Sequence, residues 1–249
     1  MKKILILVSN YCTMNVNEIM GELQAKGSES IKRTLLKHGV KEPFFGVKIE
    51  YLKPIQKKIK KDYQLAKDLF ATGNADAMYL AGLIADDEKM TKADLQNWVE
   101  HATSNNVSEY TVPWVTAGNP HGFELALEWI DSPVTHIAAS GWSALSNIVA
   151  LRPDSELDMQ KLQDLLERAE KNVHTSESRV SYHMNNFIIS VGAYVAALAH
   201  EAMTIANKIG AVTIDMNGTA CKVPVATDYI KKVWDKRGGV APKKKDVKC

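Results

Sequence analysis

The spacing of apolar residues predicts helices over almost the whole chain between residues 14 and 210. In residues 15–26 the apolar side chains recur every three or four positions, which places them on one helical face. The same spacing predicts helices at residues 28–38, 51–61, 63–72, 76–86, 91–104, 120–131, 133–151, 158–172, 179–194 and 195–209. Alternating apolar residues at 211–215 and 219–223, around an Asn217-Gly218 turn, predict a short C-terminal β-hairpin.

The number and length of these helices predict an all-α fold. Many short helices joined by short loops are typical of stacked helical pairs, and the pairs recur at roughly 35–45 residues, the range of HEAT-like repeats. We therefore expect an α-α superhelix, or solenoid, whose concave inner surface is the binding face. A compact helical bundle is the alternative.

Composition places the chain among ordinary folded proteins, with 45% hydrophobic and 24% charged residues in a length of 249. No apolar run approaches the ~20 residues needed to cross a bilayer. The three cysteines are far apart, which predicts neither a disulfide framework nor a metal site and is consistent with a reducing cytoplasm. We expect an N-terminal extension at residues 1–13, one helical-repeat domain at 14–233 and a basic tail at 234–249.

Charge is distributed unevenly along this nearly neutral chain, whose formal net charge is +2. Residues 14–61 contain ten lysines and one arginine against five acids, whereas residues 62–131 contain three lysines and twelve acids. From residue 229 onward there are seven lysines and one arginine against two aspartates. Clustered positive charge is typical of proteins that bind a phosphate backbone, although a tail of this kind can also serve only solubility.

The lysines near residue 57 have the clearest spacing. Lys53, Lys57 and Lys61 lie four residues apart on one helical stripe, where like charges repel unless an anion lies across them; a solvated helix face is the alternative. We expect lysines from both ends of the chain to converge on one nucleic-acid surface. The residues expected to contact DNA are Lys48, Lys53, Lys57, Lys61, Lys231, Lys232, Arg237, Lys243, Lys244 and Lys245.

Aromatic residues supply further candidates. Trp114 lies in a stretch, residues 110–119, that Pro113 and Gly118 interrupt, so we expect it in an irregular segment facing a groove. Phe44 and Phe45 are adjacent in a glycine-containing loop, where buried packing is the first expectation and base stacking the alternative. His183 is expected to be a hydrogen-bonded core residue. No sequence pattern indicates a metal or another cofactor.

Three segments resemble the DNA alkylation repair (AlkD-like) family of HEAT-like proteins. They are FGVKIEYLKPI at residues 45–55, ADAMYLAGLIAD at 75–86 and GTACKVPVATDYIKKV at 218–233. The resemblance covers residues 14–249 and is most specific at both ends. It implies a superhelix of HEAT-like repeats with a positively charged concave groove for duplex DNA, and its C-terminal segment is similar to that of a branch distinct from the glycosylases.

The resemblance also implies where catalytic residues would lie. Family members that excise alkylated bases stabilise a developing glycosyl cation with an aspartate and aromatic rings, assisted by an arginine. Here residues 108–118 contain no aspartate and residues 134–139 no arginine. The candidate catalytic residues are Trp114, Tyr110 and Glu109, the last of them off register, with Tyr182 and Phe187 as substitutes for a tryptophan.

The resulting expectation is a cytoplasmic, monomeric protein that binds duplex or branched DNA through phosphates, without a cofactor. Base excision is left open. The alternatives are an alkylpurine glycosylase with a divergent site and a scaffold for protein–protein interaction.

Overall fold

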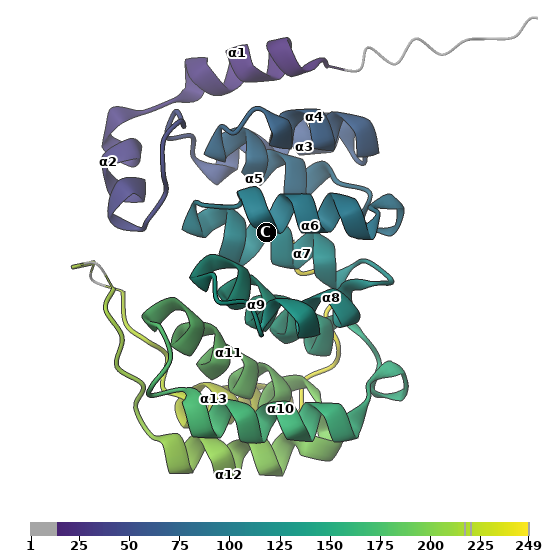
Figure 1. Ribbon diagram of the computed structural model, residues 1–249, viewed down its shortest axis with the longest axis vertical. Coiled ribbons are helices and arrows are strands. Elements are labelled where there is room, and N and C mark those ends of the chain that lie inside the picture. The colour runs from purple at the N-terminus through teal and green to yellow at the C-terminus, as the bar shows by residue number, and fades with distance from the viewer. Residues whose placement is uncertain (1–13, 217, 220, 249) are drawn as a thin grey trace, which may run out of the picture.

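The computed structural model describes residues 14–216, 218–219 and 221–248, and all regular elements within them are helical (Figure 1). The α-helices are α1 Val16–Lys26, α2 Glu29–Lys37, α3 Ile49–Ile59, α4 Tyr63–Ala71, α5 Ala75–Ile84, α6 Lys92–His101, α7 Val112–Ala117, α8 Gly122–Trp129, α9 Thr135–Leu151, α10 Met159–Asn172, α11 Ser178–Tyr194, α12 Ala199–Ile209 and α13 Ala226–Arg237. A π-helix, η2 Val107–Thr111, leads into α7, and three short 3-10 turns are η1 Asp87–Lys89, η3 Asp154–Glu156 and η4 Ala196–Leu198. The predicted all-helical class is confirmed.

Polar side chains at the helix starts explain several of these boundaries. Asn15 and Glu18 form a reciprocal capping box at the start of α1. Thr91 and Asp94 form another at the start of α6, with the three-residue spacing between cap and acid that is typical of a capping box. Asp62 caps α4 by accepting a hydrogen bond from the third residue of that helix.

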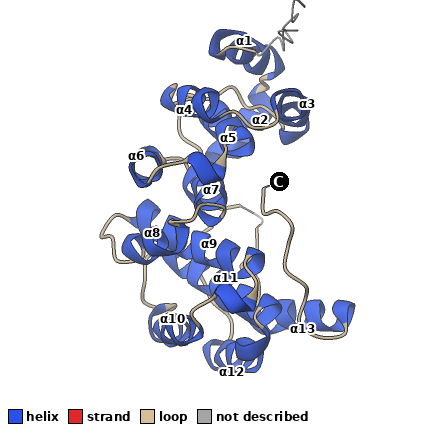
Figure 2. Ribbon diagram, turned by 90° about the vertical axis from the view of Figure 1, so that its right-hand side faces the viewer, coloured by secondary structure: helices blue, strands red, loops and turns tan. Residues whose placement is uncertain are grey.

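The helices stack in successive layers along the long axis of the molecule (Figures 1 and 2). α4 packs on α5, α8 on α9, and α11 on both α9 and α12. Their buried side chains form two cores, a first core in the N-terminal layers and a second core in the C-terminal layers, whose residues overlap in sequence only between positions 117 and 129. Contacts across this junction therefore determine how the two halves sit against each other.

The predicted β-hairpin is wrong. The described residues between α12 and α13 contain no strand, and Asn217, the first residue of the predicted turn, lies outside the described residues. Val212 is buried, and Ile214 and Val223 pack against the second core. Their alternation therefore reflects an extended segment that covers helices, because its apolar side chains are buried against α-helical neighbours and not against a partner strand.

The stretch predicted as irregular, residues 110–119, is mostly helical. The π-helix η2 runs directly into α7, and Pro113 lies in the first turn of α7. Pro113 has no N–H to donate to the preceding turn, and the carbonyls of Ser108 and Glu109 in that turn accept hydrogen bonds from the side chains of Ser140 and Ser143. At the other end of the chain α13 continues to Arg237, past the predicted boundary of the basic tail.

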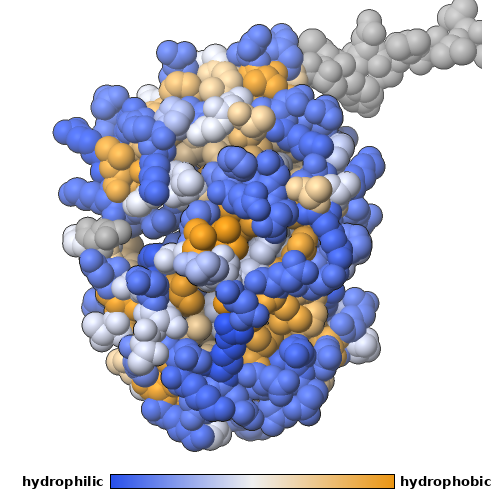
Figure 3. All heavy atoms as spheres, in the orientation of Figure 1, coloured by the Kyte–Doolittle hydropathy of each residue, from blue (hydrophilic) through white to orange (hydrophobic). Residues whose placement is uncertain are grey.

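The predicted extension at residues 1–13 lies outside the described residues. No single helix among the described residues is long and apolar enough to cross a lipid bilayer; α11 and the stretch Ala196–Ile209 reach that length only as a pair bent by 110°. Hydrophilic side chains cover most of the face seen in Figure 3, and apolar side chains show in separate patches between them.

Candidate nucleic-acid interface

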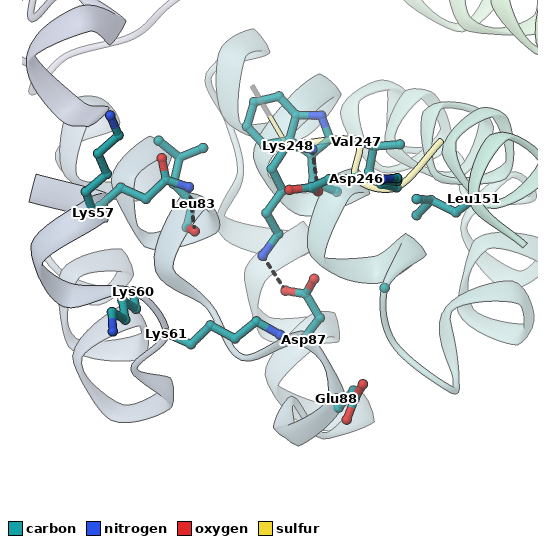
Figure 4. A pocket seen from close by; sticks show the side chains of 14 residues that line it. Lys57, Lys60, Lys61, Leu83, Asp87, Glu88, Leu151, Asp246, Val247 and Lys248 are labelled. Atoms are coloured by element: carbon teal, nitrogen blue, oxygen red, sulfur yellow. Dashed lines mark hydrogen bonds and ion pairs between the residues drawn. The ribbon is translucent and has the colours of Figure 1, made fainter. Parts of the chain in front are cut away.

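The C-terminal end of α3 carries lysines that line a cavity of about 770 Å³, the lysine cavity (Figure 4). α3 forms as an amphipathic helix, because Leu52 and Ile55 are buried in the first core while its lysines are exposed. Cations at this end also interact favourably with the helix dipole. Three of these lysines, Lys57, Lys60 and Lys61, line the cavity.

The backbone at the end of α3 is strained. Lys60 has φ 68°, and it is the one non-glycine residue with a positive φ in the part of the chain that the structure describes. A residue with a side chain in this region costs about 1–3 kcal/mol, and such strain gathers at functional sites. Here the sharp end of α3 leaves Lys60 and Lys61 beside the cavity.

The C-terminal strap, which we define as residues 241–248, reaches the same cavity from the other end of the chain. The N–H of Ala241 donates to the carbonyl of Ala193 at 2.8 Å, and the N–H of Lys244 donates to the carbonyl of Ala150 at 2.7 Å. Lys245 then lines the cavity with the lysines of α3. Three of the ten residues expected to contact DNA, Lys57, Lys61 and Lys245, therefore share one cavity.

The other seven expected DNA-contacting residues do not line this cavity. They are Lys48, Lys53, Lys231, Lys232, Arg237, Lys243 and Lys244. Lys53 is exposed on α3, and Lys231, Lys232 and Arg237 are exposed on α13. The ammonium of Lys48 lies 3.4 Å from Glu50, and that of Lys243 lies 2.7 Å from Asp154, so both of these lysines have an acidic partner.

Acidic residues also line the lysine cavity. The ammonium of Lys248 lies 2.6 Å from Asp87 Oδ1, and Lys61 extends toward the same carboxylate (Figure 4). Burial raises the pKa of Asp87 to about 6, although the charges of Lys248 and Lys61 act to lower it. Because Glu88 and Asp246 line the cavity too, the lysines there outnumber the carboxylates by five to three.

A second cavity of about 360 Å³, the tyrosine cavity, lies beside the first. The two cavities follow α5, since Tyr79 lines the tyrosine cavity and Leu83, one turn later, lines the lysine cavity. Tyr79, Tyr110 and Tyr182 supply aromatic surface, and Leu35, Val40, Val47, Ile49 and Leu52 supply aliphatic surface.

Glu109 lines the tyrosine cavity and is 3% exposed. Its carboxylate accepts two hydrogen bonds from the guanidinium of Arg179, with Nε 2.6 Å from Oε1. His183 Nε2 lies 3.3 Å from Oε2, poorly aligned for a hydrogen bond. Burial acts to raise the pKa of Glu109, but its interactions with His183 and Arg179 outweigh burial and hold the pKa below its usual range.

The π-helix explains why Glu109 faces Arg179. In a π-helix each N–H bonds to the carbonyl five residues back, as Val112 does to Val107, so the turn contains one residue more than an α-helical turn. This offset points Glu109 inward, toward α11, while Tyr110 is 44% exposed. Extending a regular α-helical register through these residues would not place Glu109 toward α11.

The structure places the other candidate catalytic residues as follows. Trp114 does not project into open space: it is 3% exposed, packs edge-on against Tyr79 and forms part of the wall of the lysine cavity. Tyr182 lines the tyrosine cavity, where the guanidinium of Arg179 lies 4.8 Å from its ring centroid. Phe187 is fully buried against Trp142 and has a packing role.

Phe44 is buried, as first expected, and the loop that carries it is held by a buried carboxylate. Asp76 accepts backbone hydrogen bonds from Phe45, Gly46 and Val47 at 2.6–3.2 Å. Burial raises the pKa of Asp76, although these three hydrogen bonds act to lower it. The arrangement fixes one wall of the tyrosine cavity.

Sequence reasoning missed Arg179, Lys60, Lys248 and Asp87. Arg179 is the only Lys, Arg, Asp or Glu in the 17 residues of α11, and such an isolated charge is a signal for a buried partner. Lys60 was overlooked because it does not belong to the stripe of Lys53, Lys57 and Lys61, which recur every four residues. Lys248 and Asp87 are far apart in sequence, so no local pattern connects them. Among the described residues, no group of three or more His, Cys, Asp or Glu side chains is placed to hold a metal ion.

The stacked helices are characteristic of a helical-repeat protein, and comparison with known proteins agrees. A solved structure superposes with a TM-score of 0.86 and 34% sequence identity, over 95% of this chain and 100% of the other. It is described as a new family of proteins related to the HEAT-like repeat DNA glycosylases with affinity for branched DNA structures.

Sequence comparison identifies the family. Residues 19–212 match the family described as DNA alkylation repair enzyme, and the chain belongs to that family. Two uncharacterized Listeria proteins are also similar, each over 216 residues that cover 85% of this chain and 93% of the relative: Lmo0209 of Listeria monocytogenes is 30% identical and Lin0241 of Listeria innocua 29%.

Proposed function

We propose that this protein binds branched or duplex DNA through its phosphates, with the lysine cavity as the centre of the interface. The observation that carries the proposal is the meeting of Lys57, Lys60 and Lys61 with Lys245, from opposite ends of the chain, around one cavity. Lysines outnumber carboxylates around this cavity by five to three, so positive charge is left in excess there, and a phosphate backbone supplies further anions that relieve the repulsion among the lysines.

The proposal includes the finer architecture. The layers of helix pairs in Figures 1 and 2 would form an α-solenoid of HEAT-like repeats, acting as a monomer, with the lysine cavity on its concave side. The related structure, described by its affinity for branched DNA, supports this partner. At a branch point two backbones converge, so phosphates from two arms reach one compact group of lysines.

Binding to a four-way junction and to a linear duplex of equal length, measured against salt concentration, tests the proposal. Four lysines that each neutralise one phosphate predict a slope of log K against log salt of about −3 to −4. We expect the junction to bind more tightly than the duplex at every salt concentration. Weak binding to both DNAs without salt dependence would contradict the proposal and would favour a protein–protein scaffold.

The tyrosine cavity supports a second candidate function, excision of an alkylated base. Glu109, Tyr110 and Tyr182 bring together the carboxylate and aromatic rings that stabilise a cationic transition state. However, the two hydrogen bonds from Arg179 already neutralise that carboxylate. We therefore expect no release of free base from methylated DNA. Release that disappears in Glu109→Gln would instead support the second function.

A further inference from the structure

The C-terminal strap connects the two halves of the molecule. It begins on the second half, through the hydrogen bonds from Ala241 to Ala193 and from Lys244 to Ala150. It ends on the first half, where Val247 packs against the first core and Lys248 meets Asp87. The strap therefore spans the junction between the cores and borders the lysine cavity along its way.

The lysines of the strap have two different environments. Lys243 and Lys248 are anchors. Lys243 Nζ donates to the carbonyl of Val149 at 2.8 Å and lies 2.7 Å from Asp154. The side chain of Lys248 is 8% exposed, and its Nζ donates to the carbonyl of Ala85 at 3.2 Å as well as to Asp87.

Between these anchors, Lys244 and Lys245 are exposed. The ammonium of Lys244 lies 5.4 Å from the ring centroid of Tyr194, and Lys245 borders the cavity. A lysine on an unanchored tail would lose conformational entropy on meeting a phosphate, whereas one on a strap held at both ends has already lost most of it. Anchoring the strap thus lowers the cost of a contact made by Lys245.

We propose that the Lys248–Asp87 ion pair is a latch that holds the strap across the lysine cavity and so presents Lys245 to a DNA phosphate. The inference rests on the proposed function and assigns a positioning role to two residues that need not touch DNA. Lys248 adds little to phosphate binding by its own charge, because Asp87 neutralises it. Its contribution comes from where it holds the neighbouring lysine.

Asp87→Asn separates this latch from simple electrostatics. The substitution removes a negative charge beside the interface, so electrostatics alone predicts tighter DNA binding. The latch predicts weaker binding, because the amide no longer holds Lys248 and the strap detaches. Asp86→Asn is the matched control: Asp86 pairs with Lys61 and Lys89 at 4.0 and 2.9 Å, whereas Lys248 of the strap pairs with Asp87, so loss of the Asp86 charge should tighten binding.

The test makes two measurements on the whole chain. One is the affinity for a four-way junction at several salt concentrations, and the other is amide hydrogen exchange. We expect Asp87→Asn to bind about fivefold to tenfold more weakly, with a salt slope smaller by about 1, and Asp86→Asn to bind at least as tightly as wild type. Exchange at the Lys244 amide should accelerate in Asp87→Asn but not in Asp86→Asn. Lys248→Gln should weaken binding to a similar extent, and adding Asp87→Asn to it should change little.

Two outcomes separate the latch from the function on which it rests. If Asp87→Asn binds as tightly as Asp86→Asn and its strap exchanges at the wild-type rate, the latch is overturned while DNA binding stands. If the wild-type protein shows no salt-dependent DNA binding, the proposed function and the role of Lys245 both fail, even where exchange shows that the ion pair anchors the strap.

Discussion

Arg179 donates a hydrogen bond from Nε to Oε1 of Glu109 across 2.6 Å, and with it joins the π-helix of one half to α11 of the other. The Glu109 side chain is 2% exposed and that of Arg179 is 23% exposed. This ion pair is deeply buried at its acidic end. It fixes the geometry of the tyrosine cavity, because separating the two side chains would leave a buried charge without its partner.

Glu109→Gln should therefore destabilise the fold. Removing one partner of a buried pair typically costs 3–5 kcal/mol, and the partial exposure of Arg179 places this case at about 3 kcal/mol. Urea unfolding followed by circular dichroism measures the change. Glu100→Gln, at an exposed position on α6, is the control and should change stability little. A loss below about 1 kcal/mol for Glu109→Gln would show that water compensates the separated charges.

The same residue predicts a pH dependence. Because the pKa of Glu109 is lower in the folded chain than its ordinary value of 4.5, its contribution to stability is present above about pH 4.5 and is lost as pH falls through the folded pKa. The difference in unfolding free energy between wild type and Glu109→Gln should stay constant from pH 7 to pH 5 and shrink below pH 4. A difference that grows toward acid pH would contradict this sign.

Gly82 allows α5 to approach the π-helix. A Cβ at this position would lie 2.5 Å from Cγ2 of Thr111, so Gly82→Ala should destabilise the fold by about 1–3 kcal/mol through overpacking. Thr111→Ser removes that methyl group, and the double variant should recover part of the loss. Thermal unfolding of the two single variants and the double variant measures the coupling, and strictly additive losses would argue against this contact.

The lysine cavity predicts which charges matter for DNA. Lys57→Gln, Lys61→Gln and Lys245→Gln should each reduce the salt slope of junction binding by about 1, because each removes one phosphate contact. Lys161→Gln, on α10 at the opposite side of the helix stack in Figure 2, is the charge-matched control. Equal losses for all four variants would show that net charge, and not the cavity, governs binding.

The Lys248–Asp87 contact should respond to pH near 6. Burial raises the pKa of Asp87 to about 6, with Lys248 and Lys61 acting to lower it and Asp246 acting to raise it. Since the folded pKa exceeds the ordinary value of 3.8, ionisation of Asp87 disfavours the folded state, and this group's contribution to stability falls as pH rises from about 4 to 6. The ion pair requires the ionised carboxylate, so it exists at pH values above about 6 and is lost as pH falls through 6.

Carboxyl NMR of Asp87 measures this titration directly. Lys248→Gln should raise the apparent pKa further, because it removes the charge that favours the carboxylate. Strap amides, corrected for intrinsic exchange, should lose protection between pH 7 and pH 5 in wild type but show no such change in Asp87→Asn. An unshifted pKa in Lys248→Gln would mean that the two groups do not interact in solution.

Much of the fold follows from local patterns. The helix at residues 15–26 and the capping spacing at Thr91 depend on residues within one or two turns, so the sequence is sufficient to predict them. The β-hairpin prediction failed for a related reason, since alternation records only which side chains are buried. What those side chains pack against, strands or helices, is set by distant parts of the chain.

The candidate site was predicted less completely. Counting charges located Lys57, Lys61 and Lys245, but local spacing could not show that Lys243 pairs with Asp154 or that Trp114 is buried against Tyr79. The inward orientation of Glu109 depends on one extra residue in a π-helical turn. The periodicity of apolar residues does not predict such a turn, because the turn is stabilised by packing against α5 and α9, which are distant in sequence.

By itself, then, the sequence determined the helical class, most helix positions and the concentration of positive charge at both ends, since these depend on neighbouring residues and on composition. Only the tertiary structure decided which lysines share a cavity, which acids neutralise the remaining lysines and which arginine pairs with Glu109. Those outcomes depend on distances between residues far apart in the chain, and the stacking of the helix layers sets these distances.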